Sequence, residues 1–242
     1  MDPLPEGRRA AVSLTYDDAL PVHRELVAPL LSERGLRGTF YTPAAAPDLH
    51  RKVEAWRGVA GLGHELGNHT CWHPCRNDHG KASWVRYDLR DYSQRRIEDE
   101  VRLANAILRL IDGETERTYA ATCGHITIGP TEAPVDFTHG LTKDVACIRA
   151  GGTKAPVPFD QVDFVVPHVA ADHKAAADLI AIVDQAREQG GWVVFMIHGV
   201  GEGTYNLHMD PAEHRKLLDH IAAHSDEIWA APTIAVAKHL AG

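Results

Sequence analysis

The chain has 242 residues, with 25 Lys or Arg and 33 Asp or Glu, so its formal net charge is −8 when histidines are neutral. Apolar residues at 44% and charged residues at 24% are typical of globular proteins and exclude disorder, collagen and coiled coil. The acidic balance argues against nucleic acid as a partner, and no apolar stretch reaches the roughly 18 residues of a membrane span. We expect one domain over residues 1–242, with no nucleic acid and no membrane as partners.

Short runs with a β-like pattern, which predict strands, alternate with longer segments of helical pattern, which predict helices. The predicted strands are 10–15, 38–42, 65–70, 119–123, 145–149, 164–169, 192–197 and 228–231. The predicted helices are 21–34, 49–59, 93–110, 175–189, 211–224 and a short terminal segment. This order predicts an α/β fold in which a parallel sheet forms a closed or nearly closed (β/α) barrel. An open doubly wound sheet is the alternative.

The helix at 93–110 has the clearest pattern. Ser93 can cap its N-terminus, and its apolar stripe consists of Ile97, Val101, Ala104 and Leu108. The preceding residues 71–92 are polar and aromatic without a period, which predicts a long loop.

The N-terminus and the cysteines bear on where the protein works. Residues 1–9 contain no apolar run and no cleavage site, so we expect no signal peptide. The protein is then cytoplasmic, or secreted if a leader has been removed. Its cysteines are too few for a disulfide scaffold, and we expect all of them to be ordinary packing thiols. They are Cys71, Cys75, Cys123 and Cys147.

Polar clusters follow three of the predicted strands. The first strand ends in Thr15-Tyr16-Asp17-Asp18, the third in His69-Thr70-Cys71-Trp72-His73, and the strand at 192–197 in His198. In a (β/α) barrel the carboxyl ends of the strands form the rim where active sites are built. We therefore expect these clusters to converge.

The spacing of His69 and His73 indicates a metal site. Two imidazoles and one carboxylate form a common catalytic metal shell with positions open to water and substrate. Thr70 stands where a zinc metalloprotease motif needs Glu, which excludes that class. The base must come from elsewhere, and Asp17-Asp18 can supply one carboxylate for the metal and one for the proton of water.

Together these motifs resemble the polysaccharide deacetylases with the NodB homology domain, carbohydrate esterase family 4. The likeness spans about residues 10–234 and rests on Tyr16-Asp17-Asp18, on His69-x-x-x-His73-Pro74 and on His198 after a late apolar strand. It implies a distorted (β/α) barrel of about seven strands with outer helices. It also implies hydrolytic removal of acetyl groups from an oligosaccharide or polysaccharide.

The resemblance implies a role for each motif residue. Asp17 would be the catalytic base and His198 the acid that protonates the leaving group. Asp18, His69 and His73 would bind a divalent metal, with zinc expected and cobalt, nickel or manganese as alternatives.

The sequence departs from the family pattern at the third motif, where an Arg and a Pro are absent from the strand at 119–123. That Arg usually orients the base, and Arg149 on another strand either replaces it or is an ordinary salt-bridged residue. The fourth motif, an Asp that tunes the acid, corresponds to Asp163-Phe164. The expected substrate contacts are Tyr16, Trp72, Cys123, Gly124 and Arg149.

Three functions remain open after the sequence is read. The first is a metal-dependent carbohydrate deacetylase acting on N- or O-linked acetyl groups. The second is a hydrolase of a cyclic amide, imide or ureide on the same barrel. The third is a non-catalytic carbohydrate-binding relative. The three predicted metal ligands and Asp17 favour the first, while the sugar, the linkage and the oligomeric state are not encoded in any visible pattern.

Overall fold

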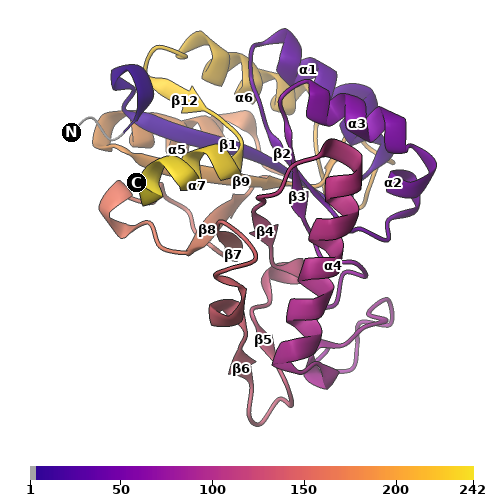
Figure 1. Cartoon of the computed structure of the whole chain (residues 1–242). Coiled ribbons are helices and arrows are strands. Elements are labelled where there is room, and N and C mark those ends of the chain that lie inside the picture. Colours follow the sequence, from indigo (N-terminus) through magenta and orange to yellow (C-terminus); the bar gives the residue numbers. More distant parts are fainter. Residues whose placement is uncertain (1–3) are drawn as a thin grey trace.

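A computed structural model describes residues 4–242, and seven parallel strands form a barrel with helices outside it (Figure 1). In order around the barrel they are β1 Ala10–Asp17, β2 Thr39–Thr42, β3 Glu65–Asn68, β4 Tyr119–Ala120, β7 Ile148–Gly152, β8 Val165–Ala170 and β9 Gly191–Ile197. β9 pairs with β1 from Ala10 to Tyr16 and closes the barrel. The predicted closed barrel is confirmed, and this pairing rules out the open sheet.

An eighth strand, β12 Ile228–Ala230, makes the barrel irregular. It pairs with residues 10–12 of β1, whereas β2 pairs with residues 15–17 of the same strand. Two strands therefore share one edge of β1, while β9 occupies the other edge along its length. The expected distortion of the barrel has its structural origin at this shared edge.

The helices cover the outside of the barrel. They are α1 Ala28–Glu33, α2 Pro47–Arg51, α3 Val53–Gly61, α4 Gln94–Asp112, α5 Ala176–Gln189, α6 Pro211–Ala223 and α7 Thr233–Ala241. The predicted helix at 21–34 begins as a π-helical turn, His23–Val27, beside Pro29, which has no N–H to donate. Within residues 4–242, every helix is too short or too polar to cross a membrane.

Helix α4 forms as the sequence predicts. The Ser93 hydroxyl accepts a hydrogen bond from the Arg96 N–H at its start, and Gly113 ends it in the left-handed region with φ of 81°. The predicted apolar stripe is buried. Its side chains pack partly against the barrel and partly against the segment described next.

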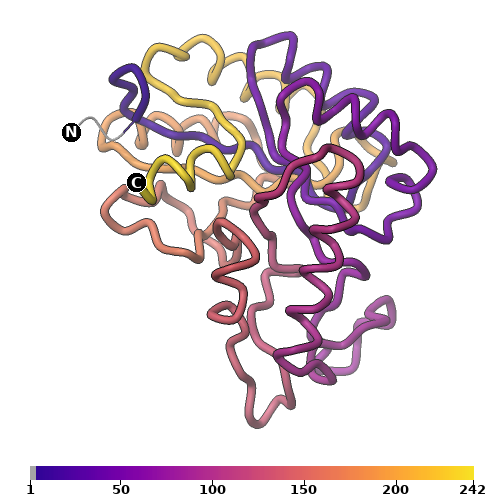
Figure 2. The backbone as a smooth tube through the Cα atoms, viewed as in Figure 1, coloured from indigo at the N-terminus to yellow at the C-terminus, as the bar shows by residue number. Residues whose placement is uncertain are grey.

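Between β3 and β7 the chain forms an extension that projects from the barrel (Figures 1 and 2). It contains much of α4, the loop at 71–92 and the hairpin of β5 Thr127–Ile128 with β6 Val135–Asp136. A second apolar cluster fills it, formed by residues that include Leu89, Tyr92, Ile97, Val101, Phe137 and Leu141. β4 is shorter than predicted because the chain turns at Cys123 and Gly124, whose φ angles are 55° and 70°.

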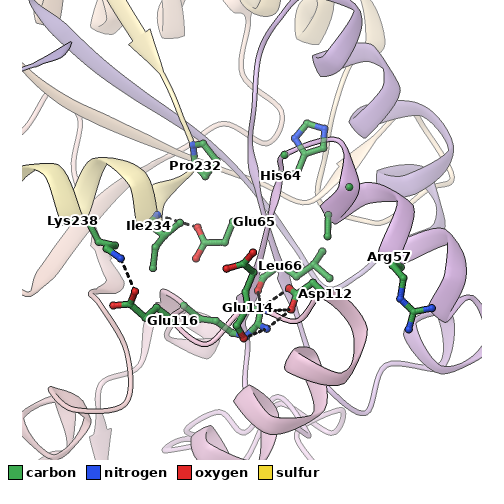
Figure 3. A pocket seen from close by; sticks show the side chains of 14 residues that line it. Arg57, His64, Glu65, Leu66, Asp112, Glu114, Glu116, Pro232, Ile234 and Lys238 are labelled. Carbon is green, nitrogen blue, oxygen red and sulfur yellow. Dashed lines mark hydrogen bonds and ion pairs between the residues drawn. The ribbon is translucent and has the colours of Figure 1, made fainter.

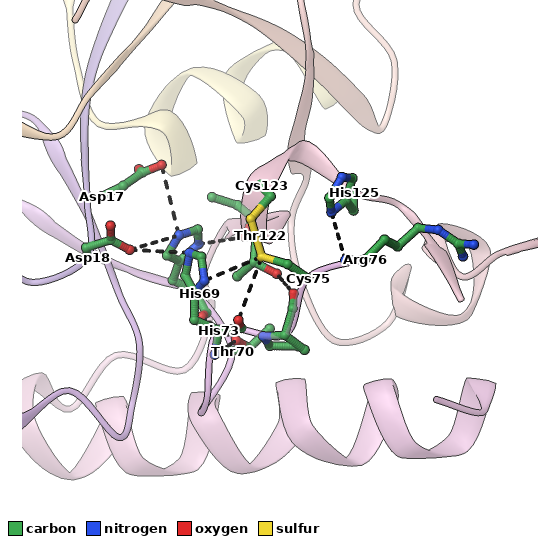
Figure 4. Close-up of a disulfide and its surroundings, with 12 residues drawn as sticks. Asp17, Asp18, His69, Thr70, His73, Cys75, Arg76, Thr122, Cys123 and His125 are labelled. Atoms are coloured by element: carbon green, nitrogen blue, oxygen red, sulfur yellow. Dashed lines mark hydrogen bonds and ion pairs between the residues drawn. A yellow bond between two sulfur atoms is a disulfide. The ribbon is translucent and has the colours of Figure 1, made fainter. Parts of the chain in front are cut away.

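A disulfide joins Cys75 to Cys123, with 6.1 Å between their Cα atoms (Figure 4). It links the loop after β3 to the turn after β4 and encloses α4. The expectation of four packing thiols is therefore wrong for this pair, and it holds for Cys71 and Cys147, which are free and buried. The partners lie 48 residues apart in sequence, so their spacing gave no sign of the pairing.

Reduction of this disulfide should destabilise the protein. Opening a loop of 48 residues restores conformational entropy to the unfolded chain, and we expect the free energy of unfolding to fall by about 4 kcal/mol. Urea unfolding with and without a dithiol measures the change. The double variant Cys75→Ser/Cys123→Ser is the control and should not respond to the dithiol. Equal unfolding midpoints for oxidised and reduced wild type would contradict the prediction.

Candidate metal centre and acid–base groups

The three polar clusters converge at one end of the barrel, as the strand-end motifs predict. Asp17 is the last residue of β1, His69 directly follows β3, and His198 directly follows β9. Asp18 and His73 lie in the turns after β1 and β3 with φ of 81° and 54°. These turns direct the side chains of different strands toward a common point (Figure 4).

Asp18, His69 and His73 form a cluster with the dimensions of a metal site. The Asp18 Oδ1 atom lies 3.6 Å from His69 Nε2 and 3.4 Å from His73 Nε2. Ligands bound tetrahedrally to zinc at about 2.0–2.2 Å are roughly 3.3–3.6 Å apart. The three side chains therefore fit a divalent cation, and their donor set of two imidazoles and one carboxylate suits zinc and its neighbours in the first transition series.

Hydrogen bonding and burial prepare His69 as a ligand. Its Nδ1 atom donates to the Ala120 carbonyl oxygen at 2.8 Å, because a carbonyl can only accept. The Nε2 atom that faces Asp18 therefore has a free lone pair. Burial lowers the pKa of His69 to about 4, so the ring is neutral near pH 7, as metal binding requires.

Asp17 is held by a cation inside the barrel. Its Oδ2 atom accepts a hydrogen bond from Arg149 Nη2 at 2.5 Å, and both side chains are at most 3% exposed. Burial alone raises the pKa of Asp17, but the positive charge of Arg149, with His69 and His198 nearby, holds it below its usual range. The other oxygen, Oδ1, is buried and has no hydrogen-bond partner within residues 4–242. Asp17 is thus an ionised carboxylate with one oxygen able to accept a proton.

Arg149 is fixed by three strands. It extends from β7, donates from Nη1 to Thr15 Oγ1 on β1 at 2.9 Å, and lies 4.8 Å from the ring centre of Tyr41 on β2. Gly67 on β3 leaves room for that ring, since a Cβ there would lie 2.5 Å from it. Of the two alternatives for Arg149, the structure shows the one in which it pairs with Asp17. Tyr41 is a supporting residue that the sequence did not reveal.

His198 is paired with a carboxylate that the sequence interpretation missed. Asp172, just after β8, accepts hydrogen bonds from His198 Nδ1 at 2.6 Å and from its backbone N–H at 3.0 Å. Burial alone lowers the pKa of His198, yet the bond to Asp172 and the charge of Asp17 raise it above its ordinary value. The expected partner Asp163 is exposed, bonds to the N–H of Phe164 and precedes β8, at the opposite end of the barrel.

Tyr205 is a second residue that the sequence did not reveal. It lies in the loop between β10 Gly199–Val200 and β11 His208–Met209. Its ring stacks on His198 with centroids 5.7 Å apart and an angle of 18° between the planes. Burial and the negative charge of Asp18 raise the pKa of its hydroxyl to about 12. Tyr205 therefore connects the predicted acid to a predicted metal ligand.

The remaining predicted substrate contacts differ in position. Tyr16 is fully buried and hydrogen-bonds His214 Nε2 at 2.9 Å, because it faces the opposite side of β1 from Asp17. The structure thus removes Tyr16 from the site. Trp72 is 45% exposed and stacks on Tyr87, with ring centroids 5.5 Å apart.

Cys123 and Gly124 lie in a turn at the edge of the site. The disulfide of Cys123 places the sulfur of Cys75 3.6 Å from His73 Nδ1 (Figure 4). The two sulfurs also lie close enough to His73 to form a second group of three potential ligands. Their bond to each other removes the thiolates that a metal would need.

A cavity of about 480 Å³ lies away from this cluster, at the end of the barrel where β3 begins (Figure 3). Several of its charged side chains are paired with their neighbours. Arg117 bonds Asp112, Lys238 bonds Glu116, and Glu65 accepts from the Ile234 N–H. The candidate metal ligands, Asp17 and His198 thus lie at the carboxyl end of the barrel, away from this cavity.

Comparison with known proteins identifies the family. The model of the polysaccharide deacetylase family matches residues 5–129, more than half of the chain. A search of curated proteins gave no match.

Solved structures share the fold at low sequence identity. A Mycobacterium smegmatis protein described as a polysaccharide deacetylase has a TM-score of 0.66 at 17% identity, over 98% of this chain and 92% of its own. The peptidoglycan deacetylase PdaC of Bacillus subtilis has a TM-score of 0.57 at 16% identity, over 98% and 93%. A family 4 acetyl xylan esterase of Clostridium thermocellum, solved with a cobalt ion, has a TM-score of 0.56 at 16% identity, over 93% and 89%. With the family match over more than half of its length, this chain belongs to the polysaccharide deacetylase family.

Proposed function

We propose that this protein is a metal-dependent hydrolase that removes acetyl groups from an oligosaccharide or polysaccharide. The observation that carries the proposal is the convergence of Asp18, His69 and His73 beside a separate, ionised Asp17. A ligand triad with a free carboxylate next to it is the arrangement that metal-assisted hydrolysis needs. The proposed unit is the whole chain, since β12 near the C-terminus completes the sheet at β1.

The proposed reaction uses the two acid–base groups in turn. A bound divalent cation would polarise the acetyl carbonyl and make water more acidic. Asp17 Oδ1 accepts the proton of the attacking water while Arg149 holds Oδ2. His198 donates a proton to the leaving nitrogen or oxygen, and Asp172 keeps its ring in the orientation that allows this. The products are acetate and the free amine or alcohol of the sugar.

The surroundings suggest the remaining features of the proposal. Zinc is the proposed metal, with cobalt, nickel and manganese as alternatives for the same donors. The exposed Trp72 and the turn at Cys123 and Gly124 border the proposed substrate site, and an aromatic face suits a sugar ring. The disulfide favours an oxidising compartment as the place where the protein works.

Removal of metal tests the proposed function directly. Chelation and dialysis should abolish acetate release from acetylated chito-oligosaccharides or acetylated xylo-oligosaccharides, and added zinc or cobalt should restore it. Asp17→Asn is the matched variant. It should keep its metal and lose activity by a factor of about 100 or more, as expected for loss of a general base. Acetate release that persists after elemental analysis shows no metal would refute the proposal.

Arg149 should set the acidic limit of activity. In Arg149→Met the pKa of Asp17 should rise, because the cation that holds it down is gone. A base must be ionised, so the acidic limb of the kcat/KM profile should move to higher pH. Arg149→Lys keeps the charge and should shift less. Metal content is measured at each pH, and unchanged acidic limbs in both variants would show that Arg149 does not tune the base.

Asp172 should set the alkaline limit in the same way. An acid must be protonated, and Asp172 raises the pKa of His198. In Asp172→Asn this pKa should fall, so activity should be lost at lower pH than in the wild type. Asp163→Asn is the matched control and should leave the profile unchanged. Identical profiles for wild type and Asp172→Asn would contradict the prediction.

A further inference from the structure

We infer that Glu100 is a positioning residue that holds the loop between His69 and His73 in the shape that metal binding requires. The inference rests on the proposed function, because that function makes the two histidines metal ligands. Glu100 lies on α4, outside the barrel wall, and only 4% of its surface is exposed. No motif in the sequence drew attention to it.

The contacts of Glu100 bridge two distant segments. Its Oε1 atom accepts hydrogen bonds from the backbone N–H groups of Cys71 and Trp72, both at 3.1 Å. Its Oε2 atom accepts from the Tyr92 hydroxyl at 2.9 Å. Both oxygens of a buried carboxylate are therefore used, and the two backbone donors lie between the proposed metal ligands. Hydrogen bonds to an ionised acceptor are stronger than neutral ones.

The loop needs such a partner because its backbone is strained. Thr70 and His73 have φ of 62° and 54°, a left-handed conformation that residues other than glycine rarely adopt. The N–H of Thr70 bonds Asn68 Oδ1, and the N–H of His73 bonds Thr70 Oγ1. The outer N–H groups of the loop are thus satisfied by nearby side chains of the same chain segment, Asn68 and Thr70. The two middle ones depend on Glu100.

Helix α4 gives this carboxylate a fixed position. Ile97 and Val101, one on either side of Glu100 in sequence, are fully buried in the second apolar cluster. The side-chain amide of Asn68, just before His69, also donates to the Val101 carbonyl at 2.9 Å and to Asn105 Oδ1 at 2.7 Å. Helix α4 therefore contacts this segment in two places. One is at Asn68, just before His69, and the other is at Glu100, which bonds the backbone between His69 and His73.

The test is metal affinity, measured by titrating zinc or cobalt into metal-free protein. Glu100→Ala should raise the dissociation constant by about 10- to 100-fold, the usual cost of losing a group that orients a metal ligand. Glu100→Gln should restore much of the affinity, because its amide oxygen can still accept from both N–H groups. Tyr92→Phe, which removes one bond to the carboxylate, should weaken binding less than Glu100→Ala.

A control separates positioning from general stability. Leu108 lies about two turns further along α4 and packs in the barrel core, away from the loop. Leu108→Ala should lower the melting temperature yet leave the dissociation constant for metal unchanged. In metal-free Glu100→Ala, the amide hydrogens of Cys71 and Trp72 should exchange faster than in the wild type. At saturating metal, the kcat of Glu100→Ala should be close to that of the wild type, although its affinity for metal stays lower.

The outcomes distinguish this inference from the proposed function. If Glu100→Ala binds metal as tightly as the wild type, or loses no more affinity than Leu108→Ala, the positioning role is wrong. If the wild type binds one metal ion tightly but releases no acetate, the proposed function fails and the positioning role is still decided by the variants. If the wild type binds no divalent cation, both are overturned.

Discussion

Asp17 and Arg149 carry opposite charges inside the barrel, and the geometry of the site depends on their contact. A buried ion pair gains little net stability, but removing one partner leaves an uncompensated charge at a cost of about 3–5 kcal/mol. Arg149 also bonds Thr15 and lies over Tyr41, so β1, β2 and β7 are fixed relative to one another around a single guanidinium. The orientation of Asp17 follows, with one oxygen held and the other able to accept a proton.

At the carboxyl end of the barrel, the pKa values of Asp17 and His198 are shifted in opposite directions. The pKa of Asp17 is lowered by Arg149, and the pKa of His198 is raised by Asp172. Each shift favours the charged form of its group, the carboxylate of Asp17 and the imidazolium of His198. Their attraction also favours both charges, because each lies within the field of the other. A base and an acid with these states are what hydrolysis of an amide or ester requires.

The site was predictable where Asp and His residues stand at the ends of predicted strands. Asp17 and His198 each follow an apolar run and His69 follows a short predicted strand. A parallel barrel brings such strand ends together. Asp172 was missed because it lies 26 residues from His198 and two residues beyond its strand, with no aromatic neighbour to mark it. Tyr16 was misjudged because the prediction followed its place in the motif and overlooked strand alternation, which puts Tyr16 on the opposite face of β1 from Asp17.

The fold was predictable to a similar extent. The alternation of predicted strands with predicted helices indicated the barrel. The helix α4 was predictable because the residues of its apolar stripe are the ones that are buried. The pairing of Cys75 with Cys123 was not predictable, because a tertiary contact sets it. The proposed role of Glu100 has the same character: a carboxylate on a helix acts on a loop 28 residues earlier.

The edge of β1 that β12 and β2 share has a consequence for synthesis on the ribosome. Residues 15–17 find β2 as soon as the first quarter of the chain has emerged, whereas residues 10–12 wait for residues 228–230. Until then the nascent chain exposes an unpaired strand edge, a surface prone to pairing with other chains. The other edge of β1 pairs with β9 along residues 10–16, so both ends of the barrel close only after residues 191–197 have emerged. β12 then covers the remaining part of the shared edge.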